Sequence, residues 1–356
     1  MTQNKPSNPK SGPSYYRLTV DSVRPETAEA SSFVFVPEQG EETIFAYEPG
    51  QFLSFRIPYK AGDIVRSYSL SSSPSTDPAM TVCIKRVSDG LGSNWFNDHL
   101  KAGMSIEATR PSGRFVLRDS AAPLLLIAGG SGITPCISLI KHALNETERH
   151  VKLVYANQNT ASVIYREQLN ELESRFPDRF ICQHWLDDKS GFLTAADITA
   201  AASGWEQADC YICGPGPLMD LAEETLIDLF GIDATILIER FVSPDDPEQT
   251  QDTADVSTTN DETLIESYRL TLDEEEHTVP IGAGETLLEA AIAAGLDAPS
   301  SCTEGHCGTC LSWLREGDVE MNSTKALSKR DIGRGYILAC QSRPSSRDPI
   351  WLDFDI

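Results

Sequence analysis

The sequence predicts a multidomain protein in which an antiparallel β-barrel, an α/β domain with a parallel sheet and a small α+β domain follow one another. Three observations lead to this prediction. Short β-rich segments separated by turns run from Tyr16 to about Leu117, strands alternate with helices from Leu124 to Glu239, and closely spaced cysteines mark the C-terminal part. A chain of 356 residues is long enough for two or three domains.

The first domain is expected at residues 15–118. Six short segments there are rich in Val, Ile, Phe and Thr, have Pro and Gly between them, and are predicted to be strands: Tyr16–Val23, Phe33–Val36, Phe52–Ile57, Ser67–Leu70, Met80–Val87 and Ser105–Thr109. One helix is predicted at Asn94–Leu100. Six short antiparallel strands indicate a small closed barrel.

Two motifs in this barrel have the chemistry of a cofactor site. In Arg66-Ser67-Tyr68-Ser69-Leu70, the alternation of a strand places Arg66 and Tyr68 on one face. Arg66 could bind a phosphate and Tyr68 could stack on a flat ring. Gly90-Leu91-Gly92-Ser93 opens a helix, where free amides attract phosphate and Ser93 could cap the helix or donate to the phosphate. Taken alone, each motif is explained better without a cofactor, the first as an ordinary strand and the second as a glycine turn before a capped helix.

The second domain is expected at residues 119–242. Its predicted strands are Leu124–Ile127, Val151–Ala156, Phe180–Trp185, Tyr211–Cys213 and Ile236–Glu239. Four helices are predicted between them: one from the first glycine turn to about Leu144, and the others at Arg166–Phe176, Thr194–Ala202 and Leu218–Phe230. This alternation predicts a parallel sheet covered on both faces. Ligands of such sheets bind at the carboxyl ends of the strands.

Two glycine turns lie at such strand ends. Gly129-Gly130-Ser131-Gly132 precedes a helix for which Thr134 is the predicted N-cap and Pro135 the first residue, and Cys213-Gly214-Pro215-Gly216-Pro217 follows the fourth strand. The first turn lacks the third glycine of a full dinucleotide motif, and a tight turn alone explains it about as well. The second turn favours a dinucleotide site. The extra 2′-phosphate of NADPH usually needs an Arg or a Lys after the second strand. Only Arg166 is close to that position in the sequence, so NADH is favoured over NADPH.

Residues 243–266 contain no Lys or Arg and are dominated by Asp, Glu, Thr, Ser, Pro and Gln, so an extended linker is expected. The third domain is expected at residues 267–356. A hairpin is predicted at Tyr268–Leu272 and His277–Ile281, a helix at Thr286–Ala294, and further strands at Leu311–Arg315 and Ile337–Cys340.

Four cysteines in this third domain have the C-x4-C-x2-C…C spacing of a plant-type [2Fe–2S] site: Cys302, Cys307, Cys310 and Cys340. Small residues between them let backbone amides approach the cluster sulfurs. A structural zinc site usually takes two C-x2-C pairs, and only one is present. A disulfide framework fits poorly with nine cysteines in a chain without a secretory signal.

One histidine and four other cysteines are not expected to bind metal. His306, inside the cysteine loop, is expected to face solvent and not to be a Rieske-type ligand. Four further cysteines show no spacing and are expected to be buried small hydrophobic residues: Cys83, Cys136, Cys182 and Cys210.

Composition narrows the classes of partner. Hydrophobic residues make up 40% of the chain, yet no run of eighteen apolar residues predicts a membrane span. Residues 1–14 are polar and are expected to form a disordered tail, not a signal peptide, so a reducing cytoplasmic location is expected. The net charge of −24 argues against binding to nucleic acid or anionic membranes. The acidity could steer an electron carrier to a basic protein partner, or only confer solubility.

Together these features resemble the reductase components of multicomponent oxygenases, from about Tyr16 to Asp355. The motifs R-x-Y-S-L, G-x-x-S, G-G-S-G-I-T-P and C-G-P-G-P-L-M and the cysteine spacing occur in the order that this family has. Segments Tyr47–Leu53, Gly305–Gly308 and Leu338–Pro344 are similar to the corresponding sequences of 3-ketosteroid 9α-hydroxylase reductases. Phenylacetyl-CoA epoxidase reductases share much of the same sequence.

The resemblance implies a flavin-binding barrel, an NAD-binding α/β domain and a β-grasp ferredoxin domain with Cys302, Cys307, Cys310 and Cys340 as cluster ligands. It implies that Arg66 contacts the flavin phosphates, Tyr68 stacks on the ring and Ser69 approaches N5. The other implied cofactor-binding residues are Leu70, Val82, Cys83, Ile84, Lys85, Gly92, Ser93 and Asn94 for the flavin, and Gly130, Gly132, Thr134, Cys213, Gly214 and Pro215 for the nucleotide. The implied catalytic residues are Tyr68, Ser69, Thr134, Cys213, Glu239 and Phe241, the last two covering the flavin.

The expected function follows from this resemblance. Electrons would pass from NADH through FAD and a [2Fe–2S] cluster to a terminal, Rieske-type oxygenase such as 3-ketosteroid 9α-hydroxylase. FMN, which the phthalate dioxygenase reductase type uses, is the alternative flavin. A second possibility is a reductase for another acceptor, such as a phenylacetyl-CoA epoxidase-like di-iron or hybrid-cluster protein. A third is a ferredoxin-like carrier whose front domains bind no cofactor.

Overall fold

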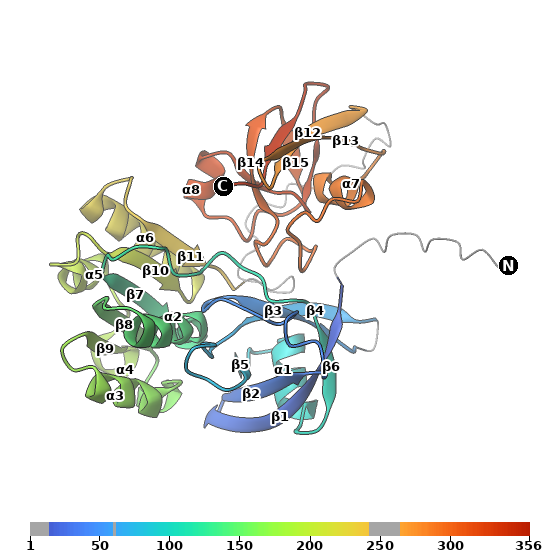
Figure 1. The fold of residues 1–356 in the computed structure, drawn as a ribbon. Coiled ribbons are helices and arrows are strands. Elements are labelled where there is room, and N and C mark those ends of the chain that lie inside the picture. Colours follow the sequence, from blue (N-terminus) through green and yellow to red (C-terminus); the bar gives the residue numbers. More distant parts are fainter. Residues whose placement is uncertain (1–13, 60–61, 242–263) are drawn as a thin grey trace. The chain divides into compact units, whose positions relative to one another are not determined.

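The computed structural model describes residues 14–59, 62–241 and 264–356. These residues belong to two compact units, one spanning Tyr15–Phe241 and the other containing the described residues from 264 onward (Figure 1). The predicted tail at 1–14 and the predicted linker at 243–266 lie almost entirely outside the described residues. No described helix combines the length and the apolar character that crossing a membrane requires.

The first part of the larger unit is a six-stranded antiparallel sheet in the order β4-β3-β6-β1-β2-β5. The edge strands β4 and β5 meet through a bridge between Leu70 and Val82 and a hydrogen bond from Ser71 N to Thr81 O, so the sheet closes on itself as predicted. The strands are β1 (Tyr16–Thr27), β2 (Ala30–Pro37), β3 (Phe52–Ile57), β4 (Ile64–Ser69), β5 (Met80–Lys85) and β6 (Ser105–Ala108).

Helix α1 (Leu91–His99) begins three residues earlier than predicted. Its Phe96 is fully buried and packs edge-to-face against Phe33 of β2 and Phe55 of β3. Such edge-to-face pairs add to the free energy gained from apolar burial. The helix is therefore anchored in the barrel core, and its N-terminal turn lies at a fixed place beside β4.

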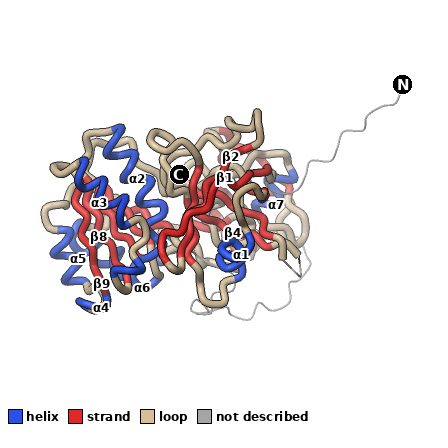
Figure 2. Tube along the Cα trace, turned by 90° about the horizontal axis from the view of Figure 1, so that it is seen from below, coloured by secondary structure: helices blue, strands red, loops and turns tan. Residues whose placement is uncertain are grey.

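The second part of the larger unit is a five-stranded parallel sheet in the order β11-β10-β7-β8-β9. Helices cover both faces, with α2 and α3 on one side and α5 and α6 on the other (Figure 2). The strands are β7 (Leu124–Gly129), β8 (Val151–Asn157), β9 (Phe180–Leu186), β10 (Asp209–Cys213) and β11 (Ile236–Glu239). The helices are η1 (Gly130–Gly132), α2 (Ile133–Glu146), η2 (Thr160–Ser162), α3 (Arg166–Arg175), α4 (Asp187–Ser190), α5 (Ala195–Ala202) and α6 (Gly216–Phe230).

The predicted start of α2 is wrong. The helix begins at Ile133 with Gly132 at the N-cap, because the 3-10 turn η1 runs directly into it. Thr134 is therefore inside the first turn, where its Oγ1 donates to Ser131 O at 3.0 Å, and Pro135 follows it. Proline is tolerated there because the first amides of a helix have no partner within it.

The barrel and the α/β part share one hydrophobic core. Ala30, Cys83 and Phe115 of the barrel side pack into the cluster that α2, α3 and the parallel sheet bury. Phe115 also packs edge-to-face against the buried Tyr211 of β10. These contacts hold the carboxyl ends of the parallel strands beside the barrel.

The smaller unit has a five-stranded sheet in the order β13-β12-β18-β14-β16. Strand β18 (Trp351–Asp353), which the sequence does not predict, lies in the middle, parallel to β12 and antiparallel to β14. The other strands of this sheet are β12 (Ser267–Leu272), β13 (Glu275–Pro280), β14 (Leu311–Glu316) and β16 (Tyr336–Leu338). A two-stranded sheet pairs β15 (Val319–Met321) with β17 (Ser342–Pro344), and the helices are α7 (Leu287–Ala293) and α8 (Lys329–Gly333).

Candidate functional site

The two barrel motifs lie against each other. A Cβ atom at Gly92 would stand 2.7 Å from Arg66 Cγ and 3.0 Å from Tyr68 Oη, so only glycine leaves room for these side chains. Arg66 is 9% exposed and donates to Val65 O at 2.8 Å. Burial raises the pKa of Tyr68 well above its usual value, so the phenol stays neutral. A cation and an aromatic ring therefore stand beside the turn into α1.

Ser69 points to the other side of β4 and reaches the parallel sheet. Its Oγ donates a 2.6 Å hydrogen bond to Oε2 of Glu239, the last residue of β11. Burial raises the pKa of Glu239 to about 7, and the hydrogen bond from Ser69 opposes that rise. The pair is therefore a carboxyl group that can hold or release a proton near neutral pH.

Three glycines bring the two turns of the parallel sheet into contact. A Cβ at Gly132 would lie 2.0 Å from Cys213 O, one at Gly214 would lie 2.9 Å from Gly129 N, and one at Gly129 would lie 2.7 Å from Pro215 Cδ. A larger residue at Gly132 or Gly214 would have to move backbone, and one at Gly129 would have to move the side chains of Pro215 and Leu218. The turns after β7 and β10 consequently lie side by side at the carboxyl end of the sheet, where nucleotides bind in folds of this class.

The predicted catalytic residues at this edge of the sheet differ in how exposed their side chains are. Thr134 and Cys213 are buried, and burial raises the pKa of the Cys213 thiol well above its usual value, so the thiol stays protonated. Cys213 pairs in register with Glu239. Phe241, two residues farther on, is 37% exposed. The structure thus brings Cys213 and the Ser69–Glu239 pair to one edge of the sheet.

Of the predicted β5 residues, only Lys85 extends toward the turns. The side chains of Val82, Cys83 and Ile84 are buried in the core. Lys85 Nζ lies 3.6 Å from where a Cβ on Gly130 would stand. A barrel lysine is therefore placed beside the first glycine turn of the parallel sheet, where it can interact with a phosphate.

Ser93 and Asn94 hold the turn before α1, and the predicted capping role of Ser93 is wrong. Ser93 Oγ accepts a hydrogen bond from Val87 N at 3.1 Å, and Asn94 Nδ2 donates to Val87 O at 3.0 Å. Gly90 is the N-cap and has no side chain to cap the helix. The amides of the first helical turn are therefore not capped by a side chain.

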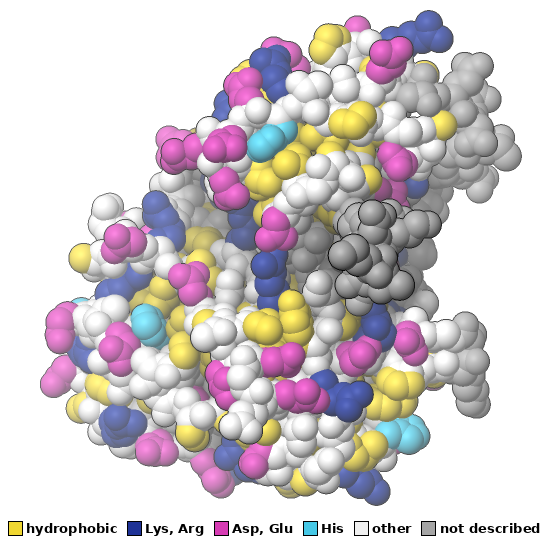
Figure 3. Space-filling view, turned by 45° about the vertical axis from the view of Figure 1, so that its right-hand side comes forward, with side chains coloured by type: hydrophobic (Ala, Val, Ile, Leu, Met, Phe, Trp, Pro, Cys, Tyr) yellow, Lys and Arg dark blue, Asp and Glu magenta, His cyan; other side chains and the backbone are white. Residues whose placement is uncertain are grey.

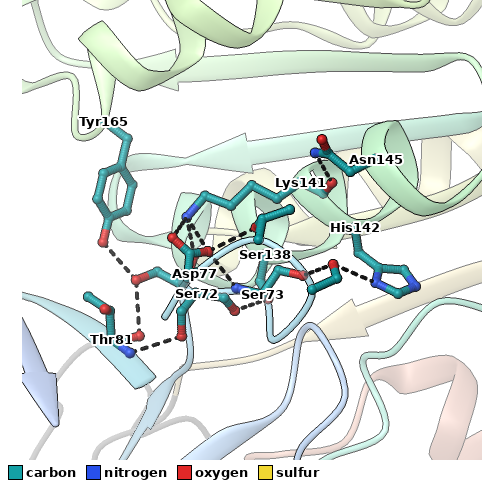
Figure 4. A network of polar contacts seen from close by, with 12 residues as sticks. Ser72, Ser73, Asp77, Thr81, Ser138, Lys141, His142, Asn145 and Tyr165 are labelled. Carbon is teal, nitrogen blue, oxygen red and sulfur yellow. Dashed lines mark hydrogen bonds and ion pairs between the residues drawn. The ribbon is translucent and has the colours of Figure 1, made fainter. Parts of the chain in front are cut away.

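A polar network that no sequence motif indicated joins the barrel to the α/β part (Figure 4). Lys141 of α2 is 7% exposed, donates to Ser71 O at 3.0 Å and pairs with Asp77 at 3.1 Å. Ser138, one turn earlier, donates to Ser72 O, and Tyr165 donates to Ser71 Oγ at 2.7 Å. The available signal was a serine followed three residues later by a lysine within the largely apolar stretch Pro135–Lys141 of α2. The network fixes the segment that follows the Ser69 strand.

The four predicted cluster cysteines lie together in the smaller unit. Three come from the loop before β14, and Cys340 follows β16. Their thiols interact as two pairs, Cys302 with Cys307 and Cys310 with Cys340. Within the described ranges, no three His, Cys, Asp or Glu side chains converge on a place for one metal ion. Two pairs suit a two-iron cluster, in which each iron takes two protein sulfurs.

Hydrogen-bond donors surround these sulfurs. Glu304 N lies 3.4 Å from Cys302 Sγ, Thr309 Oγ1 lies 3.2 Å from Cys307 Sγ, and Gln341 Nε2 lies 3.4 Å from Cys340 Sγ. The loop reaches this shape through positive φ angles at Thr303, Gly305 and Gly308. Donors at this range stabilise negative charge on sulfur, so the residues present fit an iron–sulfur cluster.

Two predictions about side-chain exposure are corrected. His306 does not face solvent but is 5% exposed, because the loop folds over it. Among the four unspaced cysteines, Cys83, Cys136 and Cys210 are buried as predicted, whereas Cys182 is only partly buried. Cys182 lies on β9, the edge strand of its sheet, where no further strand covers it.

The distribution of charged side chains can be followed on one face of the molecule. On the face drawn in Figure 3, acidic side chains are scattered among basic and uncharged ones. No single acidic patch stands out among the coloured side chains of that face.

Three family models match consecutive parts of the chain. They are the oxidoreductase FAD-binding domain at residues 18–117, the oxidoreductase NAD-binding domain at residues 126–224 and the 2Fe-2S iron-sulfur cluster binding domain at residues 270–345. Their order is the order of the barrel, the parallel sheet and the cysteine loop.

Known proteins of similar length resemble the chain along most of it. It is 42% identical over 330 residues to the 3-ketosteroid-9-alpha-monooxygenase, ferredoxin reductase component of Rhodococcus rhodochrous, covering 92% of this chain and 93% of that protein. It is 29% identical over 359 residues to a component of the 1,2-phenylacetyl-CoA epoxidase of Escherichia coli (strain K12), covering 96% and 98%. The solved phthalate dioxygenase reductase, described as a modular structure for electron transfer from pyridine nucleotides to [2Fe-2S], matches with a TM-score of 0.58 and 25% identity, covering 96% and 98%.

Proposed function

Because this chain belongs to the family of monooxygenase reductase components that combine FAD-, NAD- and 2Fe-2S-binding domains, we propose that it passes electrons from NADH to a terminal oxygenase. The observation that carries the proposal is the presence in one chain of a flavin barrel, a nucleotide sheet and a four-cysteine cluster loop. When bound, the flavin supplies the chemistry that takes an electron pair from NADH and releases single electrons to the cluster.

The proposed flavin site uses the face of β4 that meets the turn into α1. Arg66 would bind the flavin phosphates and Tyr68 would stack on the ring, with Leu70, Gly92, Ser93 and Asn94 completing the site. The contact of Gly92 with both Arg66 and Tyr68 supports this assignment. Ser69 and Glu239 would hold a proton close to the bound flavin, and their short hydrogen bond and the pKa of about 7 for Glu239 support this role.

The proposed nucleotide site is the pair of glycine turns at the carboxyl end of the parallel sheet. Backbone amides at Gly130, Gly132 and Gly214 would bind the nucleotide, with Pro215 beside them. Lys85, which the resemblance assigns to the flavin, lies next to Gly130 and would instead attract the phosphates of the nucleotide. Thr134 and Cys213 would border the nicotinamide end, and Phe241 would cover the flavin. The tight packing of the two turns supports one shared site.

The proposed cluster site consists of Cys302, Cys307, Cys310 and Cys340. Each of the two thiol pairs would hold one iron, and the surrounding amide and hydroxyl donors would stabilise the charge on the sulfurs. A thiolate cluster of this kind needs reduced cysteines, so we propose that the protein works in the cytoplasm.

The proposed partner is a Rieske-type oxygenase, and 3-ketosteroid 9α-hydroxylase is the first candidate. The 42% identity to a reductase component of 3-ketosteroid-9-alpha-monooxygenase supports it, while the 29% identity to the epoxidase component keeps a di-iron acceptor as the second candidate. A panel of purified acceptors distinguishes the two, because the true partner is reduced at the lowest acceptor concentration. If surface charge steers docking, reduction of that partner slows at high salt.

The experiment that tests this function separates the flavin from the cluster. Cys307→Ser removes one cluster ligand, so NADH-driven reduction of cytochrome c is lost while reduction of ferricyanide, which takes electrons from the flavin, is retained. Cys182→Ser, outside the cluster loop, is the matched control and retains both activities. Equal loss of both activities in Cys307→Ser would contradict the proposed route.

A further inference from the structure

The imidazole of His306 is buried inside the cluster loop and lacks hydrogen bonds. It is 5% exposed, and neither Nδ1 nor Nε2 has a hydrogen-bond partner among the residues that the structure describes. The nearest carboxylate oxygen, Glu304 Oε2, lies 3.7 Å from Nδ1, which is too long for a hydrogen bond. A buried ring N–H without a partner costs free energy, so an acceptor at this place would be favourable.

The place of the ring indicates which acceptor this is. His306 stands between Glu304 and Cys307, and its imidazole lies close enough to the Cys302 thiol for a weak polar contact, although neither ring nitrogen has the geometry of a regular hydrogen bond. The amide of Glu304 already points at Cys302 Sγ, at 3.4 Å. A side chain with a ring N–H and a backbone N–H are therefore both close to the sulfur of Cys302.

We propose that His306 donates an N–H hydrogen bond to a sulfur of the bound [2Fe–2S] cluster, on the Cys302 side, and that this bond raises the reduction potential of the cluster. Reduction adds negative charge to the cluster, and a donor to sulfur stabilises the reduced form more than the oxidised form. The proposal rests on the cluster site proposed above and adds to it a residue that tunes the cluster without binding iron.

A purely structural role for His306 makes a different prediction. In that case the ring closes the 3.7 Å gap to Glu304 and supports the loop, and the potential does not depend on its N–H. Gln replaces His306 with a side chain that keeps an N–H donor, whereas Leu keeps much of the volume and has none. The two substitutions therefore separate hydrogen bonding from packing.

The test is the midpoint potential of the cluster in the full-length holoprotein, measured by spectroelectrochemistry. We expect His306→Leu to lower the potential and His306→Gln to restore most of the difference. His277→Leu, on strand β13 of the same unit, is the control and leaves the potential unchanged. A tenfold change in the ratio of reduced to oxidised cluster corresponds to about 59 mV for one electron. A potential in His306→Leu equal to that of the unsubstituted protein overturns the proposal.

A second measurement needs no substitution at the loop. Pulsed EPR of the reduced protein grown with ¹⁵N-labelled histidine should show a nitrogen coupled to the cluster, and His306→Gln should abolish this coupling. If His306→Leu fails to assemble a cluster, these two samples decide the question, and absence of the coupling in the unsubstituted protein overturns the proposal. A purified protein without any cluster absorption would instead refute the proposed function itself.

Discussion

The hydroxyl of Ser69 donates a 2.6 Å hydrogen bond to the carboxylate of Glu239, joining the end of a barrel strand to the end of the last parallel strand. The two residues are 170 positions apart in the chain. Their contact places a titratable carboxyl group beside the strand that we propose binds the flavin. It also makes the register of β4 depend on the packing of the two parts of the larger unit.

Removing the Ser69 hydroxyl should slow electron transfer into the flavin. Ser69→Ala deletes the proton-holding partner of Glu239, and we expect flavin reduction by NADH to be about tenfold slower or more, since positioned proton donors contribute at least that much. Anaerobic stopped-flow absorbance measures the rate. Ser67→Ala, which removes only a hydrogen bond to Ser54 on the same strand pair, is the control. Equal rates in both variants would show that the Ser69 hydroxyl has no part in the reaction.

Glu239 should make stability depend on pH. Its pKa rises from 4.5 when exposed to about 7 in the fold, because burial disfavours the carboxylate. Between these values the unfolded chain has lost the proton that the folded chain keeps, so stability falls as pH rises from about 4.5 to about 7. The glutamine in Glu239→Gln cannot lose a proton. The free energy of unfolding of this variant, relative to that of the unsubstituted protein, should therefore grow by at most about 3 kcal/mol over this pH range and stay constant above it. Denaturant unfolding at several pH values measures this, and parallel curves for both proteins would contradict it.

The buried lysine at the interface should matter for stability. Lys141→Met removes the side-chain donor to Ser71 O and the cation that pairs with Asp77, whose carboxylate keeps only the neutral donors Ser73 N and Thr76 Oγ1 among the hydrogen bonds described. We expect a loss of about 2–4 kcal/mol in the free energy of unfolding. Lys189→Met changes an exposed lysine and should have almost no effect. Lys141→Met combined with Asp77→Asn should lose less than the sum of the two single changes, because both remove one interaction. An additive double variant would mean that the pair is not coupled.

A methyl group between the two glycine turns should disrupt the nucleotide site. Gly132→Ala places a Cβ 2.0 Å from Cys213 O, so the turns must separate, at a cost of about 1–3 kcal/mol and with weaker NADH binding. Gly216→Ala lies in the second turn but has no atom within 4 Å of its Cβ, so NADH binding should be unchanged. Calorimetric titration with NADH compares the two. Unchanged affinity in Gly132→Ala would argue against a site between these turns.

Local patterns predict much of this fold. All six barrel strands and all five parallel strands were predicted, because alternation, β-branched residues and turn residues are signals carried by neighbouring residues. Strand β18 was missed because three residues are too few to show alternation, and its pairing with β12 and β14 is set by the tertiary fold. The domain boundaries near residues 118 and 242 stay predictions.

The site was predictable where a motif is contiguous and unpredictable where the contact is long-range. The cysteine spacing and the glycine turns are visible within a few residues. The hydrogen bond between Ser69 and Glu239 and the ion pair of Lys141 with Asp77 depend on how two parts of the chain pack, which no local pattern contains. The burial of His306 likewise depends on how the loop closes over it.

Anaerobic titration of the purified protein with NADH, followed by visible absorption, tests the proposed electron route most directly. We expect about 1.5 equivalents of NADH to bleach both the yellow flavin bands and the reddish-brown cluster bands, because the flavin takes two electrons and the cluster one. Bleaching of the flavin alone, with the cluster bands still oxidised after prolonged incubation, would contradict this route.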